Sequence, residues 1–257
     1  MKVIVLAGGL GSRISEETNS KPKPMVSIND EPILSHIFRI YAIQGITEFV
    51  VALGYKGEVI LDWLKNQASE KYNNKYLISL DFDSRNSQTK SIQISVEAVE
   101  TGLDTQTGGR ILKCMDLYPD QTMLATYGDG LANVSISKLL AFHDSTQKLC
   151  TVTAVRPAAR FGFLEIQNGI VSHFGEKDQA DSGWINGGFF VLKPNVRNYI
   201  ENDYEPFETG ALPRLVKENQ LAAYQHFGFF KPMDTLREKN ELEEMAKRSN
   251  PPWTDIK

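Results

Sequence analysis

A glycine-rich segment near the N-terminus is closely followed by two lysines held between prolines. Residues 7–13 read Ala-Gly-Gly-Leu-Gly-Ser-Arg, and Lys21-Pro22-Lys23-Pro24 comes soon after. Glycines let backbone N–H groups converge on an anion because no Cβ stands in the way. Arg13 adds a planar guanidinium that suits phosphate oxygens, and the prolines keep the lysines on stiff, non-helical backbone. Together these residues predict a polyphosphate site.

Two familiar phosphate-binding patterns do not fit this segment. A dinucleotide pattern starting at Gly9 and Gly11 finds Ile14 where its third glycine belongs, and no Gly-Lys-Ser/Thr follows. A glycine loop alone would favour a tight turn beside a solvated basic surface, but Arg13 and Lys23 favour a ligand site. Because Lys23 lies outside any apolar pattern, we expect its removal to leave stability nearly unchanged.

Two aspartates lie where a metal ion could be held. Asp129, in Gly128-Asp129-Gly130, follows an apolar run, and the carboxyl ends of strands are where open α/β sheets bind ligands. Asp234 directly precedes a helical pattern. Carboxylate oxygens suit Mg²⁺. Each aspartate alone is equally typical of a turn or of a helix terminus.

The composition excludes several functional classes. The 257 residues include 28 basic and 32 acidic ones, giving a net charge of −4, so no global attraction to nucleic acid or an anionic membrane is expected. No stretch is apolar enough for a membrane span. Two cysteines, Cys114 and Cys150, are too few for a disulfide framework or a zinc site, which predicts a reducing cytoplasm.

The elements that must position these residues alternate along the first part of the chain. Strands are predicted at Val3–Leu6 and Phe49–Leu53, and helical spacing follows Pro32 and recurs over residues 59–64. This order predicts an α/β fold with a Rossmann-like, mixed but mainly parallel sheet flanked by helices. Residues 71–103 are predicted to form an excursion over the sheet edge.

The second half is predicted to be richer in β-structure. Four β-like runs are spaced closely enough for antiparallel pairing: residues 151–155, 163–166, 170–174 and 189–192. Ser135 is predicted to cap one helix, and Thr235 with Glu238 forms a capping box for another. No repeat or linker separates the halves, so residues 1–257 are predicted to form one domain.

Several motifs together resemble the sugar-1-phosphate nucleotidylyltransferase family. The N-terminal block, residues 6–13 with 21–26, is typical of the whole family. Further blocks resemble its cytidylyl branch: Thr107-Gly108-Gly109-Arg110, Thr126-Tyr127-Gly128-Asp129-Gly130, Arg160-Phe161-Gly162, Ile185-Asn186-Gly187-Gly188-Phe189-Phe190, Lys231-Pro232-Met233-Asp234-Thr235-Leu236-Arg237 and Pro252-Trp253. The resemblance covers nearly the whole chain. It implies that residues 1–150 mainly bind the nucleotide and residues 151–257 mainly bind the sugar phosphate.

The resemblance implies the substrates and the residues that bind them. It implies CTP and glucose 1-phosphate as substrates, CDP-glucose and pyrophosphate as products, and Mg²⁺ as cofactor, without a nucleic-acid or membrane partner; we also expect a homo-oligomer. The implied nucleotide-binding residues are Leu6, Ala7, Gly8, Gly9, Leu10, Gly11, Ser12, Arg13, Lys23, Thr105, Arg110, Gly128 and Asp129. Those implied for the sugar phosphate are Glu176, Lys177, Asn186 and Gly187, those for the metal are Asp129 and Asp234, and the catalytic ones are Arg13, Lys23 and Lys177.

The sequence departs from the family pattern in two places. Asp178 replaces the proline of a Glu-Lys-Pro triplet, and Thr105 replaces a serine while keeping its hydroxyl. Recognition of the base is expected to use a backbone carbonyl near Gly8 or Gly108, since neither loop carries a carboxylate. Two alternatives stay open: a nucleotidylyltransferase for another nucleotide or sugar phosphate, and a regulatory protein that binds sugar nucleotides without turnover.

Overall fold

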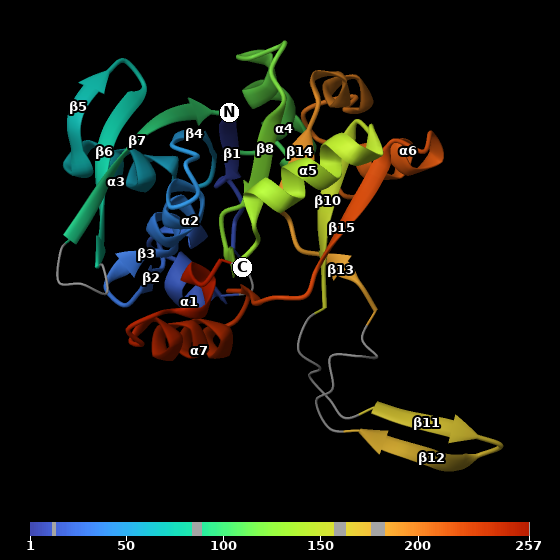
Figure 1. The fold of residues 1–257 in the computed structure, drawn as a ribbon. Coiled ribbons are helices and arrows are strands. Elements are labelled where there is room, and N and C mark those ends of the chain that lie inside the picture. The colour runs from blue at the N-terminus through green and yellow to red at the C-terminus, as the bar shows by residue number, and fades with distance from the viewer. Residues whose placement is uncertain (12–13, 84–88, 157–162, 176–182, 257) are drawn as a thin grey trace.

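The computed structural model describes residues 1–11, 14–83, 89–156, 163–175 and 183–256, and its centre is a ten-stranded mixed sheet (Figure 1). The strand order is β13-β10-β14-β8-β1-β4-β7-β6-β5, with β15 also paired to β10. The central pairs β8-β1, β1-β4 and β4-β7 are parallel. Their bounds are β1 Lys2–Leu6, β4 Glu48–Leu53, β7 Thr89–Glu100 and β8 Met123–Tyr127.

Helices cover both faces of this sheet because side chains alternate along each strand. In β1, Val3 and Val5 pack into one hydrophobic cluster, with residues of α2, α3, α5 and α7, while Ile4 and Leu6 pack into a second cluster with residues of α4 and α6. The helices are α1 Ser15–Thr18, α2 Ile33–Ala42, α3 Gly57–Gln67, α4 Thr107–Asp116, α5 Ile136–Thr146, α6 Ala211–Lys217 and α7 Leu236–Ala246. The predicted Rossmann-like α/β class is confirmed.

The remaining strands extend the sheet or form small pairs beside it. Those in the sheet are β5 Ala68–Tyr72, β6 Lys75–Asp83, β10 Cys150–Val155, β13 Ile185–Asn186, β14 Phe190–Leu192 and β15 Leu221–His226. The small pairs are β2 Ser27–Ile28 with β3 Glu31–Pro32, β9 Gly130–Ala132 with β16 Phe230–Pro232, and β11 Phe163–Gln167 with β12 Ile170–Gly175. The described residues also include the 3-10 helices η2 Lys23–Met25, η3 Pro194–Tyr199 and η4 Pro252–Thr254.

One predicted segment has a different role. Residues 71–103 were expected to pass over the sheet edge, but β7 pairs in parallel with β4 and therefore belongs to the sheet itself. The hairpin partner β6 and then β5 continue the sheet outward. The expectation was wrong because the alternation of Ile92, Ile94 and Val96 marks a half-buried strand, and alternation alone does not say which strand is its neighbour.

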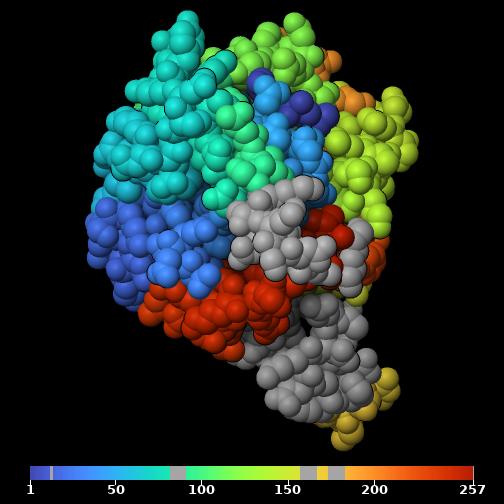
Figure 2. All heavy atoms as spheres, turned by 60° about the vertical axis from the view of Figure 1, so that its left-hand side comes forward, coloured from blue at the N-terminus to red at the C-terminus, as the bar shows by residue number. Residues whose placement is uncertain are grey.

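The predicted helix caps are confirmed. The Ser135 hydroxyl accepts the N–H of Lys138 at the start of α5, and Thr235 and Glu238 form a reciprocal capping box at α7. The C-terminal segment that includes α7 packs against the N-terminal segments, as Figure 2 shows in red beneath blue. Among the helices that the structure describes, none has the length and apolar character that crossing a membrane requires.

Candidate active site

The glycine segment and Asp129 meet at the edge of the sheet formed by the carboxyl ends of its parallel strands. β1 and β8 are parallel neighbours in which Leu6 lies opposite Tyr127, so the residues after both strands emerge side by side. The N–H of Gly128 donates to the carbonyl of Leu6 at 3.0 Å. A Cβ at Gly128 would lie 2.7 Å from the Leu6 carbonyl oxygen, so only glycine allows this approach.

The glycine loop presents its backbone to this edge. Gly11 has φ of +64°, in the left-handed region that glycine adopts without strain. The Thr18 hydroxyl donates to the Gly11 carbonyl at 3.0 Å and fixes the loop to α1. Within the described part of the chain, the N–H groups of Gly8, Gly9 and Gly11 donate to no acceptor. They remain available for an anion, which a backbone cradle of this kind can bind.

Asp234 reaches the same edge through pairing of distant segments. β16 pairs with β9 so that Pro232 lies opposite Gly130, and the Met233 N–H donates to the Asp129 carbonyl at 2.8 Å. The capping box at the start of α7 then fixes the backbone at Asp234, because Glu238 accepts the Asp234 N–H at 2.9 Å. The two aspartates are thus brought together by the fold.

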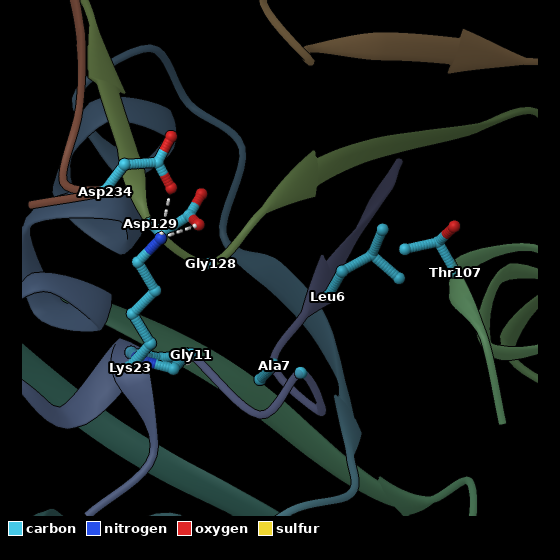
Figure 3. A pocket seen from close by; sticks show the side chains of 10 residues that line it. Leu6, Ala7, Gly11, Lys23, Thr107, Gly128, Asp129 and Asp234 are labelled. Carbon is cyan, nitrogen blue, oxygen red and sulfur yellow. Dashed lines mark hydrogen bonds and ion pairs between the residues drawn. The ribbon is translucent and has the colours of Figure 1, made fainter. Parts of the chain in front are cut away.

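Lys23 lies between these aspartates (Figure 3). Its Nζ is 2.7 Å from a carboxylate oxygen of Asp129 and 2.7 Å from one of Asp234. Burial alone would lower the pKa of Lys23, but the two carboxylates outweigh it and raise the pKa. Lys23 is buried and doubly ion-paired because the short turn η2 folds the polar segment inward. The premise that Lys23 lies outside the packed structure was therefore wrong, and the small effect on stability that rested on it is no longer expected.

These residues line a cleft of about 320 Å³. The lining residues are Leu6, Ala7, Gly9, Gly11, Lys23, Pro24, Thr107, Gly128, Asp129 and Asp234. Figure 3 shows the charged cluster of Lys23, Asp129 and Asp234 well away from Thr107, with Leu6 between them. The cleft therefore has a charged end and a neutral end, joined by glycine backbone.

The charged end suits a divalent cation. Two carboxylates already hold one cationic group, and hard oxygen donors are the ligands that Mg²⁺ prefers. Among the described residues no group of three or more metal-binding side chains occurs, so a metal here would also need phosphate or water ligands. Mg²⁺ in proteins is commonly held by one or two carboxylates together with substrate phosphates.

Arg110 lies under the glycine loop, where it binds the protein itself. Its terminal nitrogens donate to the carbonyls of Leu53, Gly8 and Leu103 and to the Thr101 hydroxyl. All four terminal N–H donors therefore have protein acceptors. The Gly8 carbonyl also accepts the Tyr55 N–H at 3.2 Å, so both of its acceptor positions are used. Recognition of the base by another backbone carbonyl near Gly8 or Gly108 stays a prediction.

The other predicted residues have varied positions. Thr105 is buried, and its hydroxyl donates to the Thr101 carbonyl at 2.5 Å; Leu10 is exposed. Asn186 donates to the Tyr127 hydroxyl at 2.9 Å, and Gly187 packs tightly against β10. Four predicted residues lie outside the described residues: Ser12, Arg13, Glu176 and Lys177.

A second polar cluster near the cleft was not assigned from the sequence. Glu208 accepts the hydroxyls of Thr107 at 2.6 Å and Tyr127 at 2.5 Å. Thr107 and Tyr127 belong to motifs that the sequence highlighted, but Glu208 follows Phe207 in an irregular segment with no motif of its own. Only its position opposite these two hydroxyls identifies it.

Comparison with known proteins agrees with this geometry. The family model described as nucleotidyl transferase matches residues 2–256. The chain belongs to the nucleotidyl transferase family. This nucleotidyl transferase is 40% identical to a glucose-1-phosphate cytidylyltransferase of Salmonella typhi, over 98% of each chain. It is also 40% identical to a probable glucose-1-phosphate cytidylyltransferase of Bacillus subtilis, over 98% of this chain and 99% of that one. The resemblance drawn from the motifs is confirmed.

Solved structures show the same fold for the nucleotidyl transferase. A putative glucose-1-phosphate thymidylyltransferase from Bacillus anthracis superimposes with a TM-score of 0.68, covering 100% of this chain and 96% of that one, at 19% identity. The mixed sheet with helices on both faces is therefore shared where most side chains differ. Nucleotidyltransferases of this family generally use a divalent metal, which agrees with the donors at the charged end of the cleft.

Proposed function

We propose that the protein transfers a cytidylyl group from CTP to glucose 1-phosphate, giving CDP-glucose and pyrophosphate. The observation that carries the proposal is Lys23 between Asp129 and Asp234 at the end of a glycine-walled cleft. Full-length similarity to glucose-1-phosphate cytidylyltransferases supports the choice of substrates.

The reaction needs charge neutralisation and alignment more than covalent chemistry. A phosphate oxygen of glucose 1-phosphate attacks the α-phosphorus of CTP, and the bond from that phosphorus to the β-phosphate oxygen breaks. The N–H groups of the glycine loop hold the phosphates of CTP, and Lys23 leaves its aspartates to contact the α-phosphate and the incoming phosphate. We assign Arg13 to the leaving pyrophosphate and Lys177 to the sugar phosphate.

We propose Mg²⁺ as the metal, held by Asp129 and Asp234. When bound, the metal would neutralise phosphate charge while pyrophosphate is displaced in line. Arg110 and Thr105 support the nucleotide indirectly. Arg110 donates to the Gly8 carbonyl and to the Thr101 hydroxyl, and the Thr105 hydroxyl donates to the Thr101 carbonyl. We assign Asn186, Gly187 and Glu176 to recognition of the sugar phosphate and its hydroxyls.

Nucleotide preference tests the proposal directly. The protein is incubated with Mg²⁺, glucose 1-phosphate and each of CTP, UTP, dTTP, ATP or GTP, and pyrophosphate release is measured. We expect kcat/KM for CTP to exceed that for UTP by about ten- to a hundredfold, because a mispaired buried group at the 4-position costs about 1 to 3 kcal/mol. Equal use of UTP or dTTP contradicts cytidylyl transfer, and no release with any nucleotide contradicts the enzyme.

The metal assignment has a test that needs no turnover. Binding of Mn²⁺ to the CTP complex is followed by electron paramagnetic resonance in the wild type, Asp129→Asn and Asp234→Asn. We expect each variant to weaken Mn²⁺ binding, and the double variant to lose less than the product of the two single effects, because both ligands serve one ion. Unchanged binding in either variant removes that aspartate from the site.

The homo-oligomeric state stays a prediction, and sedimentation measures it.

A further inference from the structure

The proposed reaction assigns no role to Glu208, which lies beside the cleft. Its carboxylate accepts one hydroxyl on each oxygen, from Thr107 on Oε2 and from Tyr127 on Oε1. Among the described residues no lysine or arginine forms an ion pair with it. A part-buried carboxylate satisfied by two hydroxyls fixes the direction of both O–H bonds, since an ionised carboxylate can only accept.

The residues that carry the two hydroxyls belong to different elements beside the cleft. Thr107 begins α4 and lines the neutral end of the cleft. Tyr127 ends β8 and directly precedes Gly128 and Asp129, which line the cleft as well. The Thr107 hydroxyl also accepts the Phe207 N–H at 2.8 Å, so its position is set from both sides.

The chain of hydrogen bonds continues from Tyr127 to Asn186. Because the Tyr127 proton points to Glu208, the phenol oxygen accepts from the Asn186 amide at 2.9 Å. The amide oxygen of Asn186 accepts the Gly188 N–H at 2.8 Å, which fixes the amide orientation. Within the described part of the chain, Asn186 keeps one N–H and one lone pair for a ligand, and its side chain is exposed.

We propose that Glu208 is a positioning residue that orients Asn186, through Tyr127, toward the hydroxyls of the sugar phosphate. This rests on the proposed function, which places the sugar beside Asn186. The carboxylate touches no reacting atom; it determines which way the Tyr127 hydroxyl and the Asn186 amide point. A hydroxylated acceptor such as a hexose 1-phosphate is the class of substrate that this pattern would recognise.

The test compares Glu208→Gln with Tyr127→Phe and with both changes together. Glutamine keeps the shape of the side chain, but one of its two ends now donates, so it cannot accept both hydroxyls. Phenylalanine keeps the ring packing on Phe190, whose centroid is 5.9 Å away, but removes the bridge to Asn186. Steady-state kinetics give KM for each substrate separately, calorimetry gives the affinity for CDP-glucose, and thermal unfolding reports stability.

We expect each single variant to raise KM for glucose 1-phosphate about tenfold, the size expected for loss of a charge-assisted hydrogen bond. The increase in KM for CTP should be smaller in both, CDP-glucose should bind more weakly, and Tm should be unchanged. The double variant should be no worse than the single ones, because both changes break one chain of bonds.

A matched control comes from the protein surface. Glu218 accepts the Tyr199 hydroxyl at 2.5 Å, the same pairing of side chains, but neither residue lines the cleft. Glu218→Gln should leave all kinetic constants unchanged. The inference is overturned if Glu208→Gln also leaves them unchanged, if the two changes add independently, or if activity falls only in step with Tm.

The test separates this inference from the proposed function. Absence of wild-type turnover with CTP and glucose 1-phosphate contradicts the function, and the same KM comparison is then made with whichever sugar phosphate the enzyme accepts. Wild-type turnover with unaltered Glu208→Gln kinetics contradicts only the role of Glu208.

Discussion

Two buried cations, Lys23 and Arg110, flank the glycine loop, and they differ in the groups that they contact. Lys23 faces two carboxylates and lines the cleft. Arg110 has three backbone carbonyls and one hydroxyl as its acceptors, and it lies beneath the loop. Burial lowers the pKa of Arg110. Burial also acts to lower the pKa of Lys23, but the two aspartates outweigh it and the pKa of Lys23 is raised.

The difference lies in what each cation could exchange for a ligand. Lys23 can leave its carboxylates when phosphate and a metal arrive, because charge is replaced by charge. Arg110 cannot leave without breaking four hydrogen bonds, and breaking the hydrogen bonds of a buried charged group is costly. Lys23 is therefore suited to catalysis, and Arg110 to holding the loop in shape.

The largest expected effect is on turnover when Lys23 is removed. Lys23→Ala should lower kcat by about 10²- to 10³-fold, as for loss of one preorganised charge-stabilising group. Lys21→Ala is the matched control: Lys21 belongs to the same segment but pairs with Glu17 at 3.6 Å and does not line the cleft. Pyrophosphate release at saturating substrates measures both. Near wild-type turnover in Lys23→Ala would remove this segment from the active site.

The next effect is on stability when Arg110 is replaced. Arg110→Met should lower the free energy of unfolding by about 3 kcal/mol or more, since four hydrogen bonds of a buried cation are lost. Arg110→Lys should recover only part of the loss, because an ammonium cannot reproduce the planar fork. Urea denaturation measures both variants. A stable Arg110→Met protein with a weakened affinity for CTP would instead indicate direct contact with the nucleotide.

Neighbouring glycines provide a smaller and sharper test. A Cβ at Gly8 would lie 2.2 Å from the Arg110 guanidinium, whereas a Cβ at Gly9 meets nothing within 4 Å. Gly8→Ala should therefore cost about 1 to 3 kcal/mol of stability, as overpacking does, and Gly9→Ala should cost little. Thermal unfolding compares the two. Equal Tm values would show that Arg110 is not held as tightly as its hydrogen bonds indicate.

The smallest effect concerns alkaline pH. The pKa of Lys23 is higher in the folded protein than in the unfolded chain, so its protonated form stabilises the fold. This stabilisation is complete below about pH 10.4, the pKa of an unperturbed lysine, and is lost as the pH rises through the folded-state pKa. The free energy of unfolding should therefore fall more steeply above pH 10 in the wild type than in Lys23→Met. Buried tyrosines such as Tyr41, whose pKa burial raises, contribute equally to both proteins. Parallel curves would show that the ion pairs do not stabilise the fold.

Local patterns in the sequence were sufficient for most elements of the fold. The apolar run before the glycines became β1, Pro32 preceded α2, and Ser135 and Thr235 capped their helices as predicted. Such signals are local because a cap or a buried strand is defined by neighbours a few residues away. The motifs were likewise sufficient to identify the family.

The sequence by itself thus determined the type of fold, the glycine loop and the presence of an acidic pair. Only the tertiary structure decided that β16 pairs with β9 and brings Asp234 to Lys23, and that Arg110 donates to the Gly8 carbonyl of the glycine loop. Glu208 was found only through its two hydroxyl partners. These contacts join segments far apart in the chain, and their geometry depends on strand register and packing, which no local pattern of residue types encodes.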